Sequence, residues 1–270
     1  MCEPRGERDV TLSVSASPEA LFESAADRCV SAAADAIRTT GAFKLALAGG
    51  STPRGLYARL ASERHAARIE WPRVHVFWGD ERCVAPQDPE SNQRMAREAL
   101  LDHVPLPAAQ VHAIRGDAEP HAEANRYERV LREAFATPSG PPRCEPGARF
   151  DLVLLGLGED GHTASLFPGR PGVREVRRWA LAAEPPEPTR SWRVTLTPPV
   201  INAAAEVIFL VSGRAKAAIL RRVLRGPREP ERLPAQAIAP RAGELRWLVD
   251  ADAASALNAP PETANDRSRP

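Results

Sequence analysis

A short apolar segment that ends in closely spaced glycines constrains this chain more than any other feature. Residues 152–155 have the composition of a buried strand. Three glycines and one histidine follow them: Gly156, Gly158, Gly161 and His162. Glycines let backbone N–H groups approach a ligand closely, and histidine exchanges a proton near neutral pH. We therefore expect a strand that leads into a catalytic loop, with His162 at the point where this loop turns into a helix.

The same glycines match the G-x-G-x-x-G pattern of dinucleotide-binding proteins, but their surroundings do not. Glu159 and Asp160 lie within the loop, where carboxylates would repel a pyrophosphate. A dinucleotide loop opens a substantial helix, whereas Pro168 comes seven residues after Gly161 and Gly169 follows it. We therefore reject a nucleotide site and expect no cofactor.

Segments with strand and helix character alternate along most of the chain. The expected strands are residues 10–14, 43–48, 74–78, 152–155, 179–183, 193–196, 206–211 and 245–249. The expected helices are residues 18–38, 55–62, 91–101, 120–135 and 214–224. This order predicts an α/β fold: a Rossmann-like, mostly parallel sheet with helices on both faces and a small additional lobe. We expect a single domain over residues 8–257, between disordered tails at 1–7 and 258–270.

Charge and hydropathy limit the partners that this chain can have. The net charge of +1 argues against nucleic acid and against an anionic membrane surface as the main partner. The first ten residues carry early charges and lack the apolar segment of a signal peptide, and no apolar run is long enough to span a bilayer. We expect a cytoplasmic protein, a monomer or weak homodimer, that acts on a small molecule.

Three loops directly follow expected strands, and ligands of open α/β sheets bind where the carboxyl ends of strands converge. The first loop, Gly49-Gly50-Ser51-Thr52, offers close backbone approach, two hydroxyl groups and a helix N-terminus, which together suit an anion. We expect Thr52 to be the N-cap of the following helix. An ordinary strand-to-helix turn explains this loop equally well.

The second loop places Asp80, Glu81 and Arg82 after the strand at 74–78. Such a cluster is most often a solvated turn, but its place at the ligand edge of the sheet favours a functional site. Arg82 has the geometry to hold a carboxylate, a phosphate or an oxyanion.

The third loop carries His162, one of six histidines. The other five lack comparable surroundings, and we take them as surface or structural: His65, His75, His103, His112 and His121. A helix-capping or core histidine is the alternative for His162, but its glycine neighbours favour general acid–base chemistry.

Two further cations are candidates for holding an anion. Arg193 lies on an otherwise apolar strand, and Lys216 lies in the first turn of an expected helix. A cation in the first turn opposes the helix dipole, so a phosphate ligand is one reason for Lys216 to be there. A solvated surface lysine is the other interpretation.

Four segments together resemble the 6-phosphogluconolactonase family: LALAGGSTPRGLYARL, VFWGDERCVAPQDPESNQRMAREALL, FDLVLLGLGEDGHTASLFPG and RVTLTPPVINAAAEVIFLVSGRAKAAIL. The four segments cover most of residues 43–224, and they follow one another in the same order as in that family. The resemblance implies the fold shared with glucosamine-6-phosphate deaminase. It also implies metal-free hydrolysis of 6-phosphoglucono-δ-lactone to 6-phosphogluconate in the oxidative pentose phosphate pathway.

The resemblance also implies roles for particular residues. His162 would be the general base and Arg82 would contact the substrate, with Asp80 as a third catalytic candidate. The expected substrate- and phosphate-binding residues are Gly49, Gly50, Ser51, Thr52, Asn92, Gly158, Asp160, Gly161, Arg193 and Lys216. The family often has a lysine in the proline-rich loop before RVTLT, where this chain has none and Arg190 is the nearest cation.

Two other functions remain as alternatives. The first is a sugar-phosphate isomerase or deaminase of the same fold. Those deaminases resemble MDEY where this chain has GDER, and GHIAFNEP where it has GHTASLFP. The second is a non-catalytic sugar-phosphate sensor, which should carry a DNA-binding helix-turn-helix that this sequence does not contain.

Overall fold

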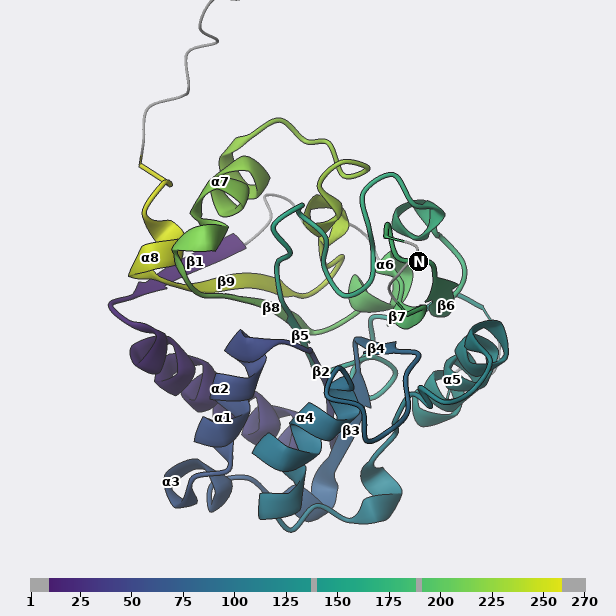
Figure 1. Ribbon diagram of the computed structural model, residues 1–270. Coiled ribbons are helices and arrows are strands. Elements are labelled where there is room, and N and C mark those ends of the chain that lie inside the picture. The colour runs from purple at the N-terminus through teal and green to yellow at the C-terminus, as the bar shows by residue number, and fades with distance from the viewer. Residues whose placement is uncertain (1–9, 137–139, 188–190, 259–270) are drawn as a thin grey trace, which may run out of the picture.

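The computed structural model describes residues 10–136, 140–187 and 191–258. Its main sheet has six strands in the order β1-β9-β8-β5-β2-β3, all paired in parallel (Figure 1). In that order they are Val10–Ser15, Glu244–Asp250, Glu206–Val211, Leu152–Leu155, Phe43–Leu47 and Val74–Trp78. The predicted parallel sheet is confirmed.

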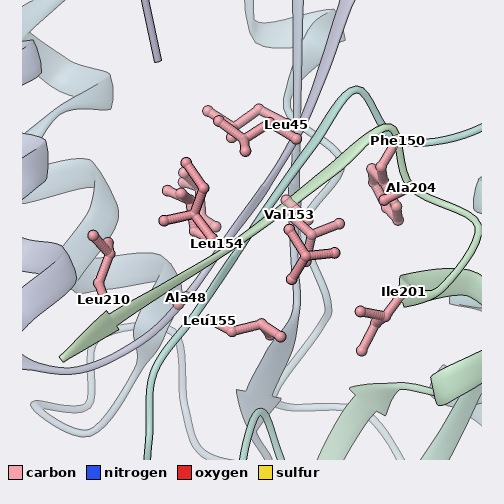
Figure 2. Close-up of a cluster of buried hydrophobic side chains, with 14 of the residues drawn as sticks. Leu45, Ala48, Phe150, Val153, Leu154, Leu155, Ile201, Ala204 and Leu210 are labelled. Atoms are coloured by element: carbon pink, nitrogen blue, oxygen red, sulfur yellow. The ribbon is translucent and has the colours of Figure 1, made fainter. Parts of the chain in front are cut away.

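The central strands β5 and β8 are buried because both faces of the sheet are covered, and apart from Glu206 at the start of β8 their residues are apolar. Every residue of β5 and β8 is buried, as expected for a parallel sheet between helical layers. Figure 2 shows side chains from β2, β5 and β8 gathered in this core, among them Leu45, Val153 and Leu210. Burial on this scale fixes the strands, so the loops at their ends begin from rigid positions.

Helices cover both faces of the sheet. They are α1 Pro18–Thr40, α2 Ser51–Leu60, α3 Glu63–Ala66, α4 Asn92–Ala99, α5 Pro120–Ala134, α6 Pro198–Ile201, α7 Ala217–Arg225 and α8 Ala251–Ala254. In the view of Figure 1, α1 and α2 lie below the sheet and α7 lies above it. The alanine-rich α1 begins after the side-chain cap of Ser17 and ends at Gly41, whose φ of 82° is left-handed.

A second, antiparallel sheet of three strands forms the small lobe, in the order β4-β7-β6. These strands are Asp80–Arg82, Arg193–Leu196 and Ala180–Ala183. The sequence predicts a loop at Asp80–Arg82, but these residues form a strand because β7 provides a partner that lies far away along the chain.

Two local expectations are wrong. The N-cap of α2 is Gly50 rather than Thr52, and the helix begins at Ser51 without a side-chain cap. Gly50 has a φ of 103°, and this conformation turns the chain early enough to place Ser51 and Thr52 inside the first turn.

The loop after β5 also does not open a helix at His162. Residues 163–166 form turns around a Thr163–Leu166 bridge. The Thr163 Oγ1 donates to the Gly156 carbonyl oxygen at 2.9 Å. A side chain that bonds locally to the backbone competes with helix formation.

The expected disordered tails fall almost wholly outside the described residues, since only Asn258 of them is described. Across the described ranges, no helix is both long enough and apolar enough to cross a membrane.

Candidate active site

The loops that follow four adjacent strands meet at one edge of the main sheet. The chain runs from β2 outward to β3, and then returns to β5 on the other side of β2. This is the point where strand order reverses, at which open α/β sheets bind their ligands. A cavity of about 320 Å³ lies there, lined by the loops after β2, β3, β5 and β8. A second cavity of about 130 Å³ adjoins it, and the two share Gly49, Gly50, Gly156, Leu157 and Lys216.

The structure brings most of the predicted site residues to these cavities. The lining of the larger one includes Gly49, Gly50, Asp80, Arg82, Asn92, Gly158, Asp160, His162, Arg193 and Lys216. The smaller one is lined by Ser51 and Thr52. Gly161 lines neither cavity. Arg190 lies outside the described residues.

His162 and Asp160 form a pair at the mouth of the larger cavity. The His162 Nδ1 lies 2.6 Å from the Asp160 Oδ1, and the His162 backbone N–H donates to the same oxygen at 3.0 Å. Partial burial raises the pKa of Asp160, but the hydrogen bonds and charge of His162 outweigh it and lower that pKa overall. The carboxylate orients the ring and accepts from Nδ1, so the opposite nitrogen, Nε2, is left for chemistry.

Glycine at position 158 makes this pair possible. A Cβ atom there would lie 2.1 Å from the His162 Nδ1 and 2.7 Å from the Asp160 Oδ1, far inside van der Waals contact. Gly161 acts differently, because its φ of 88° makes the turn and its carbonyl oxygen accepts from the Ala235 N–H. The first glycine provides space for the imidazole, and the second shapes the loop that carries it.

Two arginines lie opposite each other in the small sheet. Arg82 on β4 pairs in register with Arg193 on β7, and both line the larger cavity. Like charges directly opposite on neighbouring strands are destabilising, so an anionic ligand is a physical reason for this arrangement. The Arg82 Nη1 donates to the Glu90 carbonyl oxygen, while its buried Nε has no hydrogen-bond partner among the described residues.

Asp80 belongs to a buried network that holds the cavity wall. Its Oδ2 accepts from the Ser165 Oγ at 2.7 Å, and its Oδ1 lies 3.3 Å from the Asn92 Nδ2. Asn92 in turn fits against Gly49, where a Cβ atom would lie 2.0 Å from the Asn92 Oδ1. The Ser165 side chain is buried and lines neither cavity, so its hydroxyl is poorly placed to attack a substrate.

Sequence reasoning left the role of Glu81 open, and the structure resolves it. The buried Glu81 carboxylate accepts backbone hydrogen bonds from Arg82, Asn92 and Gln93 at 2.7–2.8 Å. It also accepts one from the Ser91 Oγ at 3.1 Å. Burial raises the pKa of Glu81, against these hydrogen bonds, which lower it. Glu81 therefore joins the strand that carries Arg82 to the first turn of α4.

Lys216 lies between the two cavities, at the end of the 3₁₀ turn Arg214–Lys216 that precedes α7. Its Nζ lies 3.7 Å from the Glu159 Oε1. Glu159 is largely exposed and Lys216 is not, so this is a loose surface pair of small energetic weight. The ammonium group is available to an anion that enters either cavity.

Sequence reasoning missed the apolar side of the cavity. Phe167 lines it and stands against the His162 ring, with 5.2 Å between ring centroids. Pro185, Pro186 and Glu187 also line the cavity. The SLFP segment contains Phe167, but no local pattern shows that its ring returns to the histidine.

Fold and site together define a class of protein. This is an α/β protein with a concave site at the strand switch point, where an Asp–His pair faces a group of cations. Such a site suits acid–base chemistry on a small anionic substrate.

Comparison with known proteins specifies the class further. The family of glucosamine-6-phosphate isomerases and 6-phosphogluconolactonase matches residues 16–247. A 6-phosphogluconolactonase of Synechocystis sp. is 42% identical over 224 residues, which make up 82% of this chain and 88% of that protein. One from Nostoc sp. is 40% identical over 224 residues, 83% of this chain and 88% of that protein. The structure of 6-phosphogluconolactonase from Trypanosoma brucei superposes on this one with a TM-score of 0.77 and is 31% identical in sequence. The match covers 92% of this chain and 99% of the Trypanosoma brucei chain.

This chain therefore belongs to the glucosamine-6-phosphate isomerase/6-phosphogluconolactonase family, and within it to the 6-phosphogluconolactonase enzymes.

Proposed function

We propose that this enzyme hydrolyses 6-phosphoglucono-δ-lactone to 6-phosphogluconate, as a step of the oxidative pentose phosphate pathway, with His162 as the general base. The observation that carries this proposal is the Asp160–His162 pair, joined at 2.6 Å, at the mouth of a cavity that also holds Arg82, Arg193 and Lys216. A lactone needs an activated water, and a phosphorylated sugar needs cations at its far end. This cavity offers both.

The first step is attack by water on the lactone carbonyl carbon. The Asp160 carboxylate accepts from the His162 Nδ1, so Nε2 takes a proton from the water as it attacks. The same imidazolium then returns a proton to the ring oxygen as the C–O bond breaks. Histidine suits both transfers because its ordinary pKa of about 6.5 lies near the working pH. No covalent enzyme intermediate is required.

The cations divide into two groups by their place in the site. Arg82 and Arg193 lie on the small-lobe side of the cavity, where Arg82 would stabilise the developing oxyanion. On the other side, Lys216 and the hydroxyls of Ser51 and Thr52 surround the adjoining cavity at the N-terminus of α2. This second group suits the phosphate, whose binding energy orients the sugar ring for attack.

A coupled assay tests this proposal. Glucose-6-phosphate dehydrogenase generates fresh lactone, and its disappearance is followed with and without the protein, because the lactone also opens slowly on its own. We expect enzymatic turnover that falls by about 10²–10⁴-fold in His162→Ala. Turnover in that variant close to wild type would contradict the role of His162. Release of ammonia from glucosamine 6-phosphate without lactone hydrolysis would instead indicate a deaminase.

A further inference from the structure

A buried histidine on the short helix α3 lies beside two carboxylates of α1. His65 on α3 is fully buried, and its Nε2 has no hydrogen-bond partner among the described residues. That atom lies 3.6 Å from the Glu23 Oε1 and 3.6 Å from the Asp27 Oδ1. Glu23 and Asp27 are four residues apart on α1, so they share one face of that helix. The three side chains therefore join α1 to α3.

The neighbouring hydrogen bonds determine which nitrogen of His65 carries the proton. The Ser62 Oγ donates its hydrogen to the Arg59 carbonyl oxygen at 2.6 Å. The same Oγ lies 3.2 Å from the His65 Nδ1. Because its hydrogen is already used, this hydroxyl accepts from Nδ1–H. In the neutral ring, the lone pair of Nε2 then points toward two carboxylates, and no described group donates a hydrogen bond to this buried nitrogen.

The distances fit a metal ion better than a hydrogen bond. An N–H···O bond spans about 2.7–3.2 Å, and 3.6 Å is too long for one. Tetrahedral zinc with bonds of about 2.0–2.1 Å separates its ligand atoms by roughly 3.4 Å. The donor atoms of His65, Glu23 and Asp27 all lie within 4.8 Å of one another, so a small inward movement brings them onto one ion.

Three arginines already pair with these carboxylates. Arg59 and Arg64 contact Glu23 at 3.3 and 2.6 Å, and Arg68 contacts Asp27 at 2.6 Å. Their side chains are 42–68% exposed, and ion pairs this exposed contribute little and rearrange readily. A metal would compete with them, so its affinity is expected to be moderate.

We propose that Glu23, Asp27 and His65 form a structural site for a divalent transition metal, with zinc as the best fit, that fastens α1 to α3. One nitrogen and two carboxylate oxygens suit zinc more than calcium or magnesium, which take six or more oxygens. The half-exposed Asp27 side leaves room for water as the fourth ligand. The Nδ1–H···Ser62 contact is the outer partner that metal-bound histidines commonly have. This site plays no part in the reaction.

Zinc titration of tag-free protein, freed of metal by dialysis against EDTA, tests the proposal. We expect zinc at a hundredfold excess over its Kd to raise the Tm by roughly 5–8 °C. Cobalt bound at this site should give the visible bands of a tetrahedral complex. His65→Gln and Asp27→Asn should each remove the zinc-dependent rise. Asp27 is half-exposed, so Asp27→Asn provides the test even where the buried His65→Gln does not fold.

Two control variants locate the ion. Asp35 lies on α1 and forms a largely exposed ion pair with Arg38. The variant Asp35→Asn should therefore keep the full zinc-dependent rise in Tm. His162→Ala should also keep it, because the proposed site is separate from the cavity. A rise that survives Asp27→Asn, or one that disappears only in His162→Ala, would overturn the proposal. A wild-type Tm that does not respond to zinc would also overturn it.

Discussion

The close approach of Gly158 to the Asp160–His162 pair provides a sharp test of the proposed site, through Gly158→Ala. The new Cβ would lie 2.1 Å from the His162 Nδ1, whereas ordinary contact needs roughly 3.4 Å. The ring therefore has to move by more than about 1 Å, and its 2.6 Å contact with Asp160 breaks. A misplacement of about 1 Å at a reacting group costs on the order of 10²-fold. We expect kcat to fall about 10²-fold, and no further than in His162→Ala.

Folding should survive this change. The φ of Gly158 is outside the left-handed region, so alanine fits the backbone, and His162 and Asp160 are both partly exposed. We expect the free energy of unfolding in urea to change by less than about 1 kcal/mol. Gly172→Ala is the matched control, because the nearest atoms to its Cβ belong to leucine side chains at 3.5–3.6 Å. Lactone turnover in Gly158→Ala equal to that of the control would refute this reasoning.

Three further predictions concern the phosphate, the cavity wall and pH. Lys216→Ala should raise the KM for the phosphorylated lactone roughly 10–100-fold, because one charged hydrogen bond to the phosphate is lost. The KM for unphosphorylated gluconolactone should not change. An unchanged KM for the phosphorylated lactone would rule out a phosphate contact. Glu81→Gln should lower the free energy of unfolding in urea by about 1–3 kcal/mol and should also lower kcat/KM. The reason is that one amide oxygen cannot accept all the backbone hydrogen bonds that the carboxylate accepts. A variant with the wild-type unfolding free energy and the wild-type kcat/KM would exclude a positioning role for Glu81. Burial lowers the pKa of His112 to about 4, so the unfolded chain binds the extra proton first, and stability is lost as the pH falls from about 6.5 toward 4. His112→Gln should flatten that loss, and an unaltered pH dependence of the unfolding free energy would contradict it.

Most of the main sheet could be predicted from the sequence because its central strands contain compact apolar runs, such as residues 152–155 and 207–211, followed by turn signals. The errors fall where a distant partner decides the local structure. Asp80–Arg82 has the composition of a charged turn, and it becomes a strand only because β7 pairs with it. The residues after His162 form turns because Thr163 bonds to the Gly156 carbonyl oxygen.

The candidate site was predictable to the extent that its residues follow strands, as His162, Gly49 and Arg82 do. The carboxyl ends of parallel strands must meet, so their loops must meet as well. The role of Glu81 and the place of Phe167 escaped that logic, because their partners come from other segments and no spacing rule connects them. His65 escaped it too. Its neighbours Glu23 and Asp27 belong to another helix, and the sequence alone classified it as surface or structural.

A crystal structure with bound 6-phosphogluconate tests the central claim most directly. The account predicts that the carboxylate carbon of this product lies beside the His162 Nε2, in direct contact or through one water. Its phosphate should lie in the adjoining cavity with Lys216 and Ser51. A product bound in the reverse direction, with its phosphate at His162, or bound outside both cavities, would contradict the account.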